Sequence, residues 1–435
     1  MPERATPASG RSGPAASTTT GDAAHDDARA ASAVSAAERG MDGLAGPPDY
    51  ARRSVSAVFT SAAAAAGVPG FDNTLNLPAA TRVCVFMVDG MGHDQLTRRS
   101  GHAPVLRSLL AGEHGATTRV LDAAFPSTTA ASLAALGTGL APGQHGLVGY
   151  DVLDPERDVV VNMLGGWDPA IDPKTWQPHP TVFERAAAHV PVSTVSQSRF
   201  ERSGMTRAAL RGARFLPAST LQAATTVATE TLAPAGPHLL YLYANDLDKA
   251  GHRYGVNSAA WEHALEEIDG AVGRLLARLP RGTLLAITAD HGMVDVDEPH
   301  RIDVSAEPDL MAGVRHTAGE PRLLQLSLAP EADRAAVITR WRERFGRVAW
   351  VMDRDQVIEA GYLGPVDPAV RPRIGDVLVA AREPVAFYDR SRVGEGPMRM
   401  VGQHGSWTAA ERRVPLVTVV APGPQGKGGG KSRRG

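Results

Sequence analysis

The sequence predicts an α/β protein with a doubly wound, mostly parallel sheet flanked by helices and with insertions that form a cap. Two observations support this fold class. Short, almost continuously apolar runs alternate with helical patterns, and several of these runs end in Asp or Asn beside glycine or histidine. Strands covered on both faces are apolar throughout rather than alternating. Strand–helix–strand order then favours a parallel sheet.

Five runs are predicted as strands because they are short and rich in bulky apolar residues. They are Val83–Val88, Val192–Ser196, Leu239–Tyr243, Leu284–Ala289 and Leu416–Val420. Between the third and the fourth run, the segment 259–279 repeats apolar residues at helical spacing, beginning with Trp261 and Leu265. This helix is predicted to connect two strands of one sheet.

The composition is that of an ordinary globular protein. Of 435 residues, 43% are apolar and 21% charged, with a net charge of −2. This balance argues against a dedicated nucleic-acid binder, whose footprint is basic. Cys84 is the single cysteine, which excludes an intramolecular disulfide and a cysteine-cluster zinc site. No signal peptide or membrane-spanning run is visible, so the expectation is a cytoplasmic protein that acts on a small molecule.

The organisation along the chain is predicted as one large domain between two tails. Residues 1–46 lack bulky apolar periodicity and are predicted to be a disordered tail. Residues 47–423 are predicted to form the domain, with cap insertions at about 151–235 and 297–400. Residues 424–435 are predicted to be a flexible basic tail.

Carboxylates and histidines cluster after the predicted strands. They are Asp89, Asp248, His252, Asp290, His291 and, just before the last strand, His404. Ligands of open α/β sheets bind beyond the carboxyl ends of the strands, so we expect these side chains to meet. Mixed Asp and His donors suit zinc or a similar divalent ion. Six ligands provide three for each of two ions and leave a position open on each.

A hydroxyl-rich loop supplies candidates for a nucleophile. Ser127, Thr128 and Thr129 follow Pro126 and open an Ala/Leu-rich helix that ends at Gly139. A hydroxyl at a helix start lies where backbone N–H groups favour an anion. The local pattern by itself favours an ordinary helix cap, and it does not separate Thr128 from Thr129. A threonine hydroxyl also needs activation, which metal coordination supplies.

These motifs together resemble the alkaline phosphatase superfamily, and most of all its type I phosphodiesterase and nucleotide pyrophosphatase branch. The resemblance spans about residues 80–420 and implies an alkaline-phosphatase-like catalytic domain for residues 47–423. The motifs that carry it are Asp89-Gly90, Pro126-Ser127-x-Thr129, Thr138-Gly139, His145-Gly146, Asp248-x-x-Gly-His252, Asp290-His291-Gly292 and His404-Gly405.

The resemblance implies two divalent ions, zinc or alternatively manganese, and a role for each residue. One ion would bind Asp248, His252 and His404. The other would bind Asp89, Asp290, His291 and the oxygen of the nucleophile. Family spacing counted back from Thr138 points to Thr129, with Thr128 as the fallback, and His145 is interpreted as structural.

The implied activity is metal-dependent hydrolysis of phosphoesters, most of all phosphodiester or nucleotide pyrophosphate bonds, through a phosphothreonine intermediate. Alternatives are a phosphonate or phosphomonoester hydrolase, a phosphate-transferring mutase, and an inactive phosphate-binding protein. Tyr150 stands where diesterases of the family carry a substrate-binding Asn, and its phenol can also donate a hydrogen bond. Sulfatases need a cysteine in the nucleophile loop, whereas Cys84 lies within a predicted strand.

Overall fold

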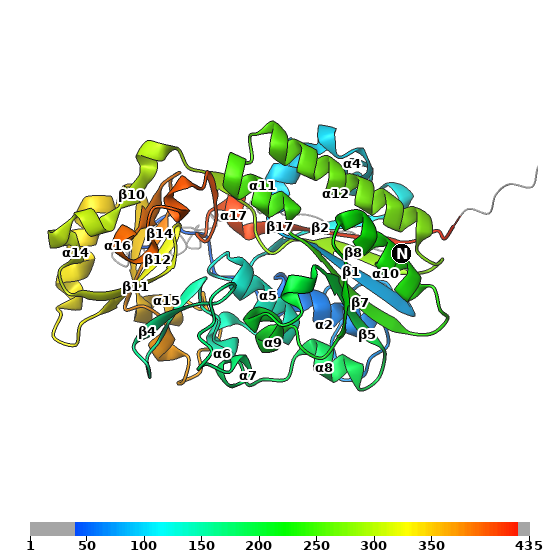
Figure 1. The fold of residues 1–435 in the computed structure, drawn as a ribbon, viewed down its shortest axis with the longest axis horizontal. Coiled ribbons are helices and arrows are strands. Elements are labelled where there is room, and N and C mark those ends of the chain that lie inside the picture. The colour runs from blue at the N-terminus through cyan, green and yellow to red at the C-terminus, as the bar shows by residue number, and fades with distance from the viewer. Residues whose placement is uncertain (1–39, 425–435) are drawn as a thin grey trace, which may run out of the picture.

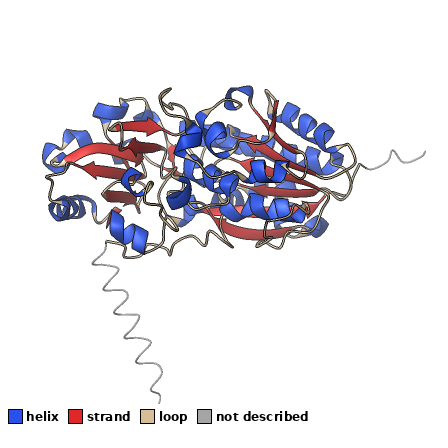
Figure 2. Ribbon diagram, turned by 90° about the horizontal axis from the view of Figure 1, so that it is seen from below, coloured by secondary structure: helices blue, strands red, loops and turns tan. Residues whose placement is uncertain are grey.

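The computed structural model describes residues 40–424, and these form an elongated molecule with two sheets (Figures 1 and 2). A seven-stranded sheet occupies one end, and a six-stranded sheet occupies the other. In the described part of the chain no helix is long and apolar enough to cross a membrane. The predicted tail residues 1–39 and 425–435 lie outside the described residues.

The seven-stranded sheet carries all five predicted strands, in the order β2-β17-β8-β1-β7-β5-β6. Neighbours from β8 to β6 pair in parallel, whereas β17 is antiparallel to both of its neighbours. The sheet is therefore mixed but mostly parallel, which confirms the predicted fold class. Its strands are Arg82–Val88 (β1), Thr117–Asp122 (β2), Val192–Ser196 (β5), Arg214–Pro217 (β6), His238–Ala244 (β7), Leu284–Thr288 (β8) and Arg413–Val420 (β17).

Helices cover both faces of this sheet, as a doubly wound fold requires (Figure 1). On one side lie Ser56–Ala65 (α2), Thr129–Thr138 (α5), Val182–Ala187 (α8) and Gly204–Ala209 (α9). On the other side lie Pro104–Leu110 (α4), Leu221–Leu232 (α10) and Ala259–Arg278 (α12). Shorter or peripheral helices are His93–Arg98 (α3), Pro142–His145 (α6), Pro173–Trp176 (α7), Asp246–Tyr254 (α11), Pro308–Met311 (α13), Arg354–Glu359 (α15), Arg390–Val393 (α16) and Ala409–Arg412 (α17).

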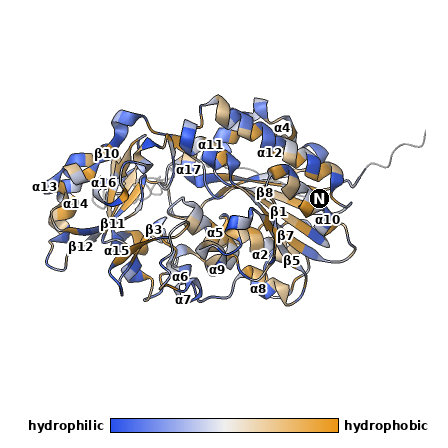
Figure 3. Cartoon of the chain, in the orientation of Figure 1, coloured by the Kyte–Doolittle hydropathy of each residue, from blue (hydrophilic) through white to orange (hydrophobic). Residues whose placement is uncertain are grey.

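The apolar runs fold as central strands because both of their faces are covered. Residues 83–88 of β1 are completely buried, and the central strands are coloured largely as hydrophobic in Figure 3. The predicted helix is confirmed as α12, which begins where the Ser258 hydroxyl accepts a hydrogen bond from the Trp261 N–H. Trp261 and Leu265 lie on its buried face. Sheet and helix thus form one core.

The six-stranded sheet is antiparallel throughout and has a hydrophobic cluster of its own. Helix α14 (Arg334–Phe345) contributes Trp341 and Phe345 to that cluster. The strand order is β13-β14-β12-β11-β3-β4, with bounds Asp151–Asp154 (β3), Val159–Asn162 (β4), Val314–Glu320 (β11), Leu323–Leu328 (β12), Ala349–Asp353 (β13) and Val377–Ala381 (β14). Two small ribbons pair Arg301–Asp303 (β10) with Ala386–Tyr388 (β15), and Val294–Asp295 (β9) with Gly402–Gln403 (β16).

Two predicted boundaries differ from the structure. Within 151–235, only β3 and β4 belong to the six-stranded sheet, because β5 and β6 are strands of the central sheet. The amino-terminal boundary also moves, since residues 40–46 are packed rather than detached. Trp350 and Trp407 donate their indole N–H groups to the carbonyls of Asp42 and Gly46. Two tryptophans fix the backbone there, a long-range effect that local composition does not reveal.

Candidate active site

The six predicted ligands meet at the carboxyl edge of β8, β1 and β7. Asp89 follows β1 directly, while Asp290 and His291 follow β8. Asp248 and His252 lie one turn apart on α11, which begins just after β7. His404 follows β16 and precedes β17. Segments distant in sequence therefore converge because parallel strands end at the same edge of the sheet.

Asp89, Asp290 and His291 form one group, the buried triad, whose ligand atoms all lie within 4.8 Å of one another. His291 Nε2 lies 3.3 Å from Asp89 Oδ1 and 3.5 Å from Asp290 Oδ2. The side chains of His291 and Asp290 are fully buried, and that of Asp89 is 4% exposed. Hydrogen bonds from Gly90 N–H and His291 N–H hold Asp290 Oδ1 in place.

Asp248, His252 and His404 form the second group, the open triad, again with all ligand atoms within 4.8 Å. His252 Nε2 lies 3.4 Å from Asp248 Oδ1, and these two side chains are 24% and 13% exposed. The two triads touch, since the rings of His291 and His404 stack with centroids 3.5 Å apart. Gly90 (φ 73°) permits the loop after β1 to approach α11 closely, because a Cβ there would lie 3.1 Å from Asp248 Cα.

Each histidine of the two triads is oriented by a backbone carbonyl. The Nδ1 atoms of His252, His291 and His404 lie 2.8 Å, 3.1 Å and 3.0 Å from the carbonyl oxygens of Gly402, Gly292 and Ser127, respectively. An Nδ1–H that donates to a carbonyl leaves the Nε2 lone pair free. Metal-binding histidines are typically fixed in this way by a partner on the second ring nitrogen.

The triads concentrate negative charge in a buried space. Burial and the charge of Asp89 raise the pKa of Asp290 well above its usual value, and they raise the pKa of Asp248 to about 6. Burial alone would lower the pKa of His291, but the charges of Asp290 and Asp89 outweigh it and raise this pKa to about 10. Burial and the positive charge of His291 hold the pKa of His404 well below its usual value.

Thr129 lies beside the buried triad, at the first residue of α5. Its Oγ1 lies 3.0 Å from His291 Nε2 and 3.5 Å from Asp89 Oδ1. The Thr128 side chain makes no capping hydrogen bond to the first turn of α5, and its buried hydroxyl interacts with the Glu320 carboxyl group. The structure therefore brings Thr129, rather than Thr128, to the predicted ligands.

Tyr150 lies where the two sheets meet, just before β3. It is 38% exposed, and its backbone N–H donates to Glu320 Oε2 (3.1 Å) at the end of β11. Tyr150 also lines the cavity beside Asp89 and Thr129. His145 lies outside both triads and is fully buried, with Nδ1 accepting the Leu147 N–H at 3.2 Å.

Two polar residues of the site were not predicted. The Tyr243 hydroxyl donates to Asp89 Oδ2, and it can do so because β7 pairs in register with β1, Tyr243 opposite Met87. The parallel pairing of these two predicted strands was the sequence signal that could have identified Tyr243. Glu320 is 5% exposed, and no sequence signal pointed to it, because it belongs to the six-stranded sheet, which was not foreseen.

Two solved structures share the fold of this chain, which confirms the predicted fold class. Murine ectonucleotide pyrophosphatase/phosphodiesterase 5 superposes with a TM-score of 0.61 at 16% identity, covering 77% of this chain and 87% of that structure. Phosphonoacetate hydrolase from Sinorhizobium meliloti 1021, solved with phosphonoformate, superposes with a TM-score of 0.61 at 18% identity, covering 82% of this chain and 94% of that structure. At such identities the likeness concerns the fold alone.

Sequence comparison defines the family more closely. Residues 83–407 match the family model of type I phosphodiesterase/nucleotide pyrophosphatase, and the chain belongs to this family. An uncharacterized pyrophosphatase/phosphodiesterase of Schizosaccharomyces pombe is 28% identical over 240 residues, 52% of this chain and 48% of the relative. The chain thus spans about half the length of that curated relative. The predicted family is confirmed.

Proposed function

We propose that this chain is a metal-dependent hydrolase that cleaves phosphodiester or nucleotide pyrophosphate bonds through a phosphothreonine intermediate. The observation that carries the proposal is the position of Thr129 at the start of α5, with its Oγ1 3.0 Å from His291 Nε2 in the buried triad. The cavity is bordered by the Thr129 hydroxyl at the amino terminus of α5, by Asp89 of the buried triad and by the whole open triad, while Asp290 and His291 lie beside Asp89.

The side chains of the triads fit divalent cations. Asp248 Oδ1 and Asp290 Oδ2 are buried and have no hydrogen-bond partner among the described residues. Buried carboxylates that lack such partners are costly unless a cation compensates their charge. Carboxylate and imidazole donors in equal numbers suit zinc, with manganese as the alternative. In our proposal each triad holds one ion, and Thr129 adds its oxygen to the buried triad.

The ions would supply positive charge that lowers the pKa of the Thr129 hydroxyl and stabilises the leaving oxygen. In the first step Thr129 Oγ1 bonds to phosphorus, the bond from phosphorus to the leaving oxygen breaks, and the threonine proton leaves with the alcohol. The free N–H groups of the first turn of α5 face the phosphoryl oxygens, because the Thr128 side chain does not cap them.

In the second step water adds to phosphorus, the bond to Thr129 Oγ1 breaks, and the threonine regains a proton. Tyr150 lines the same cavity, and in our proposal its hydroxyl donates to a phosphoryl oxygen. Tyr243 keeps Asp89 oriented toward Thr129 through its own hydrogen bond to that carboxylate.

The test is an assay of the purified protein with bis-p-nitrophenyl phosphate. We expect Thr129→Ala to lower kcat by roughly 10³-fold or more, and Thr128→Ala to keep most of the activity. Thorough chelation should abolish turnover, zinc should restore it, and metal analysis should find about two ions per chain. Turnover that survives both chelation and Thr129→Ala contradicts the mechanism. If Thr128→Ala lost activity and Thr129→Ala kept most of it, Thr128 would be the nucleophile.

Phosphonate or phosphomonoester hydrolysis is the second candidate. The cavity beside Thr129 measures only about 170 Å³, which suits small substrates, and phosphonoacetate hydrolase has the same fold. Turnover of p-nitrophenyl phosphate and phosphonoacetate measured beside bis-p-nitrophenyl phosphate separates these activities. A ratio that favours the diester supports the first proposal, and a ratio that favours the monoester or phosphonate replaces it.

A further inference from the structure

The cavity beside Thr129 extends away from the triads along the central sheet. From the cluster at β8, β1 and β7 it continues over β5 and β6, beneath α9. We call this extension the inner chamber, and its lining away from the triads includes Leu133, Thr194, Met205, Leu210, Phe215 and Tyr241. A second and larger cavity, the outer groove, shares Tyr150, Leu164, Phe200 and Ser203 with the first and measures about 640 Å³.

The floor of the inner chamber is a row of side chains across three parallel strands. Thr194 of β5 is paired with Phe215 of β6 on one side and with Tyr241 of β7 on the other. Residues opposite each other in register project from the same face of the sheet. The row continues toward the triads with Ser196 and Tyr243, two residues further along β5 and β7.

Two hydroxyls of this floor are buried without a hydrogen bond. Tyr241 Oη and Thr194 Oγ1 have no partner among the described residues, although the two residues are only 1% and 4% exposed. Ser196 Oγ has a single distant partner, the Tyr243 carbonyl at 3.5 Å. Buried hydroxyls are normally satisfied, so a pair of free ones lining one cavity indicates a bound group that completes them.

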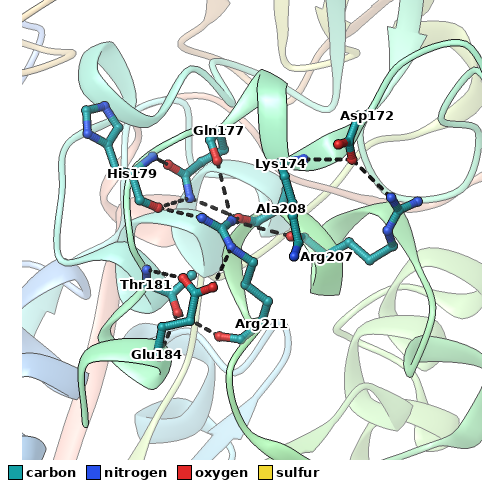
Figure 4. A network of polar contacts seen from close by, with 9 residues as sticks. All are labelled: Asp172, Lys174, Gln177, His179, Thr181, Glu184, Arg207, Ala208 and Arg211. Atoms are coloured by element: carbon teal, nitrogen blue, oxygen red, sulfur yellow. Dashed lines mark hydrogen bonds and ion pairs between the residues drawn. The ribbon is translucent and has the colours of Figure 1, made fainter. Parts of the chain in front are cut away.

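The roof of the chamber is held in place by a polar network that ties α9 to α7 and α8 (Figure 4). Arg211 donates to Glu184 Oε1 (3.0 Å) and to the His179 carbonyl (2.8 Å). Gln177 Nε2 donates to the Ala208 carbonyl (2.9 Å), and Arg207 to Asp172 (3.0 Å). These contacts fix the height of Met205 and Leu210 above the floor, and therefore the size of the chamber.

The two cavities differ in charge. The described residues that line the cavity beside Thr129 include no Lys or Arg, and its charged groups belong to the triads. The outer groove is lined by Arg199, Arg202 and Arg207 against a single acidic residue, Asp168, and Arg199 lies over the Phe200 ring at 4.7 Å. An anionic or large substituent of the substrate therefore fits the outer groove, and a neutral one fits the chamber.

The whole cavity beside Thr129, including the part at the triads, measures about 170 Å³, and an apolar cavity of roughly 150 Å³ takes up one benzene molecule. The inner chamber, which is only part of that cavity, therefore holds a group no larger than a benzene ring. We propose that the inner chamber binds one substituent of the phosphorus, a compact uncharged group that carries a hydroxyl for Tyr241 and Thr194. A nucleoside, with a base and a ribose, exceeds this chamber. The inference rests on the proposed diesterase function and narrows its substrates.

Symmetrical diesters test the size limit, because the result does not depend on which substituent leaves. The substrates are bis(3-hydroxypropyl) phosphate, dibutyl phosphate and a dinucleoside monophosphate, with products measured by phosphorus NMR. We expect kcat/KM to fall in that order, with about tenfold between the first two, the value of one hydrogen bond. A dinucleoside monophosphate that is cleaved as fast as the hydroxypropyl diester overturns the proposal.

Variants test the hydroxyl contacts. Tyr241→Phe and Thr194→Val should reduce the preference for the hydroxypropyl over the butyl diester to about onefold while dibutyl turnover persists. Thr283→Val is the matched control, since Thr283 is also buried with an unpartnered hydroxyl but lies at the opposite end of β8. An unchanged preference in Tyr241→Phe and Thr194→Val overturns the proposal.

Variants that fill the inner chamber with a larger side chain provide a second, independent test of its size. Leu210→Phe, and separately Met205→Phe, should slow the hydroxypropyl diester while dimethyl phosphate is still cleaved. Equal losses on both substrates overturn the size argument. If wild-type protein fails to cleave even bis-p-nitrophenyl phosphate, the diesterase function fails. If it cleaves that diester but shows no preference in the series, only the chamber assignment fails.

Discussion

The buried triad and the open triad contain the same residue types in different surroundings. Asp290 and His291 are shielded completely from solvent, whereas His252 keeps 24% of its side chain exposed. The buried triad lies just beyond the carboxyl ends of β1 and β8 and contacts Thr129. The open triad is assembled from α11 and a loop, and it borders the cavity beside Thr129. In the proposed mechanism, this difference assigns the buried triad to the nucleophile and the open triad to the departing group.

The strongest test of this comparison removes one ligand of the open triad. We expect His252→Ala to lower the metal content from about two ions to about one per chain, because the buried triad is intact. Turnover should fall roughly 10³-fold, about 4 kcal/mol of transition-state stabilisation. Metal analysis and kcat measure both effects, and the exposed His300→Ala serves as control. Loss of both ions from His252→Ala would show that the triads are not independent.

The next largest effect is expected at Glu411, which connects the loops of both triads. Its side chain accepts hydrogen bonds from Arg322 (2.7 and 3.0 Å) and from the Ser406 N–H, while its backbone carbonyl accepts the Gly292 N–H. Glu411→Gln leaves a buried guanidinium without its counter-charge and should cost about 3 kcal/mol of unfolding free energy. Denaturant unfolding measures this loss.

The exposed pair of Glu307 and Arg344 provides the matched control for that variant. Glu307→Gln should change the unfolding free energy by less than about 1 kcal/mol, since solvent screens the pair. Equal losses in Glu307→Gln and Glu411→Gln would contradict the structural role of Glu411.

A smaller effect of opposite sign, a gain in stability, is expected for Asp290→Asn in the metal-free protein. The amide oxygen can keep the hydrogen bonds from Gly90 and His291 N–H, while the repulsion from Asp89 disappears. The metal-free variant should therefore be more stable than the metal-free wild type by about 2 kcal/mol, and metal should stabilise it less. Thermal unfolding with and without zinc measures both shifts. A metal-free variant less stable than wild type would refute the repulsion.

The last effect is absent at neutral pH and builds up only as the pH falls, and it concerns acid stability outside both triads. Burial and the charge of His179 lower the pKa of His145 to about 3, so the unfolded chain takes up a proton near its ordinary pKa of about 6.5 while the folded chain does not. Folding stability should fall by up to about 1.4 kcal/mol per pH unit below pH 6.5 from this residue. His145→Asn should flatten the slope between pH 6 and pH 4. Exposed His300→Asn should leave it unchanged.

Local sequence determined much of the fold and of the ligand set. The apolar runs correspond to buried strands because a covered strand needs no polar face, and Asp89 and Asp290 follow such strands directly. Because the predicted strands pair in parallel, the carboxylates that follow them meet at the same edge of the sheet. The choice between Thr129 and Thr128 needed the structure, since both side chains open the same helix and only one is oriented toward His291.

Other features depend on contacts that no local pattern encodes. The six-stranded sheet pairs β3 with β11 across more than a hundred residues, so Glu320 could not be assigned to the site beforehand. The inner chamber arises from the register of β5, β6 and β7 and from the height of α9. Packed residues 40–46 likewise depend on distant tryptophans.

The position of His404, immediately before β17, has a consequence for the synthesis of the protein on the ribosome. The nascent chain emerges amino terminus first, so Asp89, Asp290 and His291 are available well before His404, which immediately precedes β17. In the proposed two-ion arrangement, the ligands of the buried triad are therefore synthesised before the open triad can be completed. A reaction that needs both triads, as we propose, is then withheld from the growing polypeptide until His404 has been made.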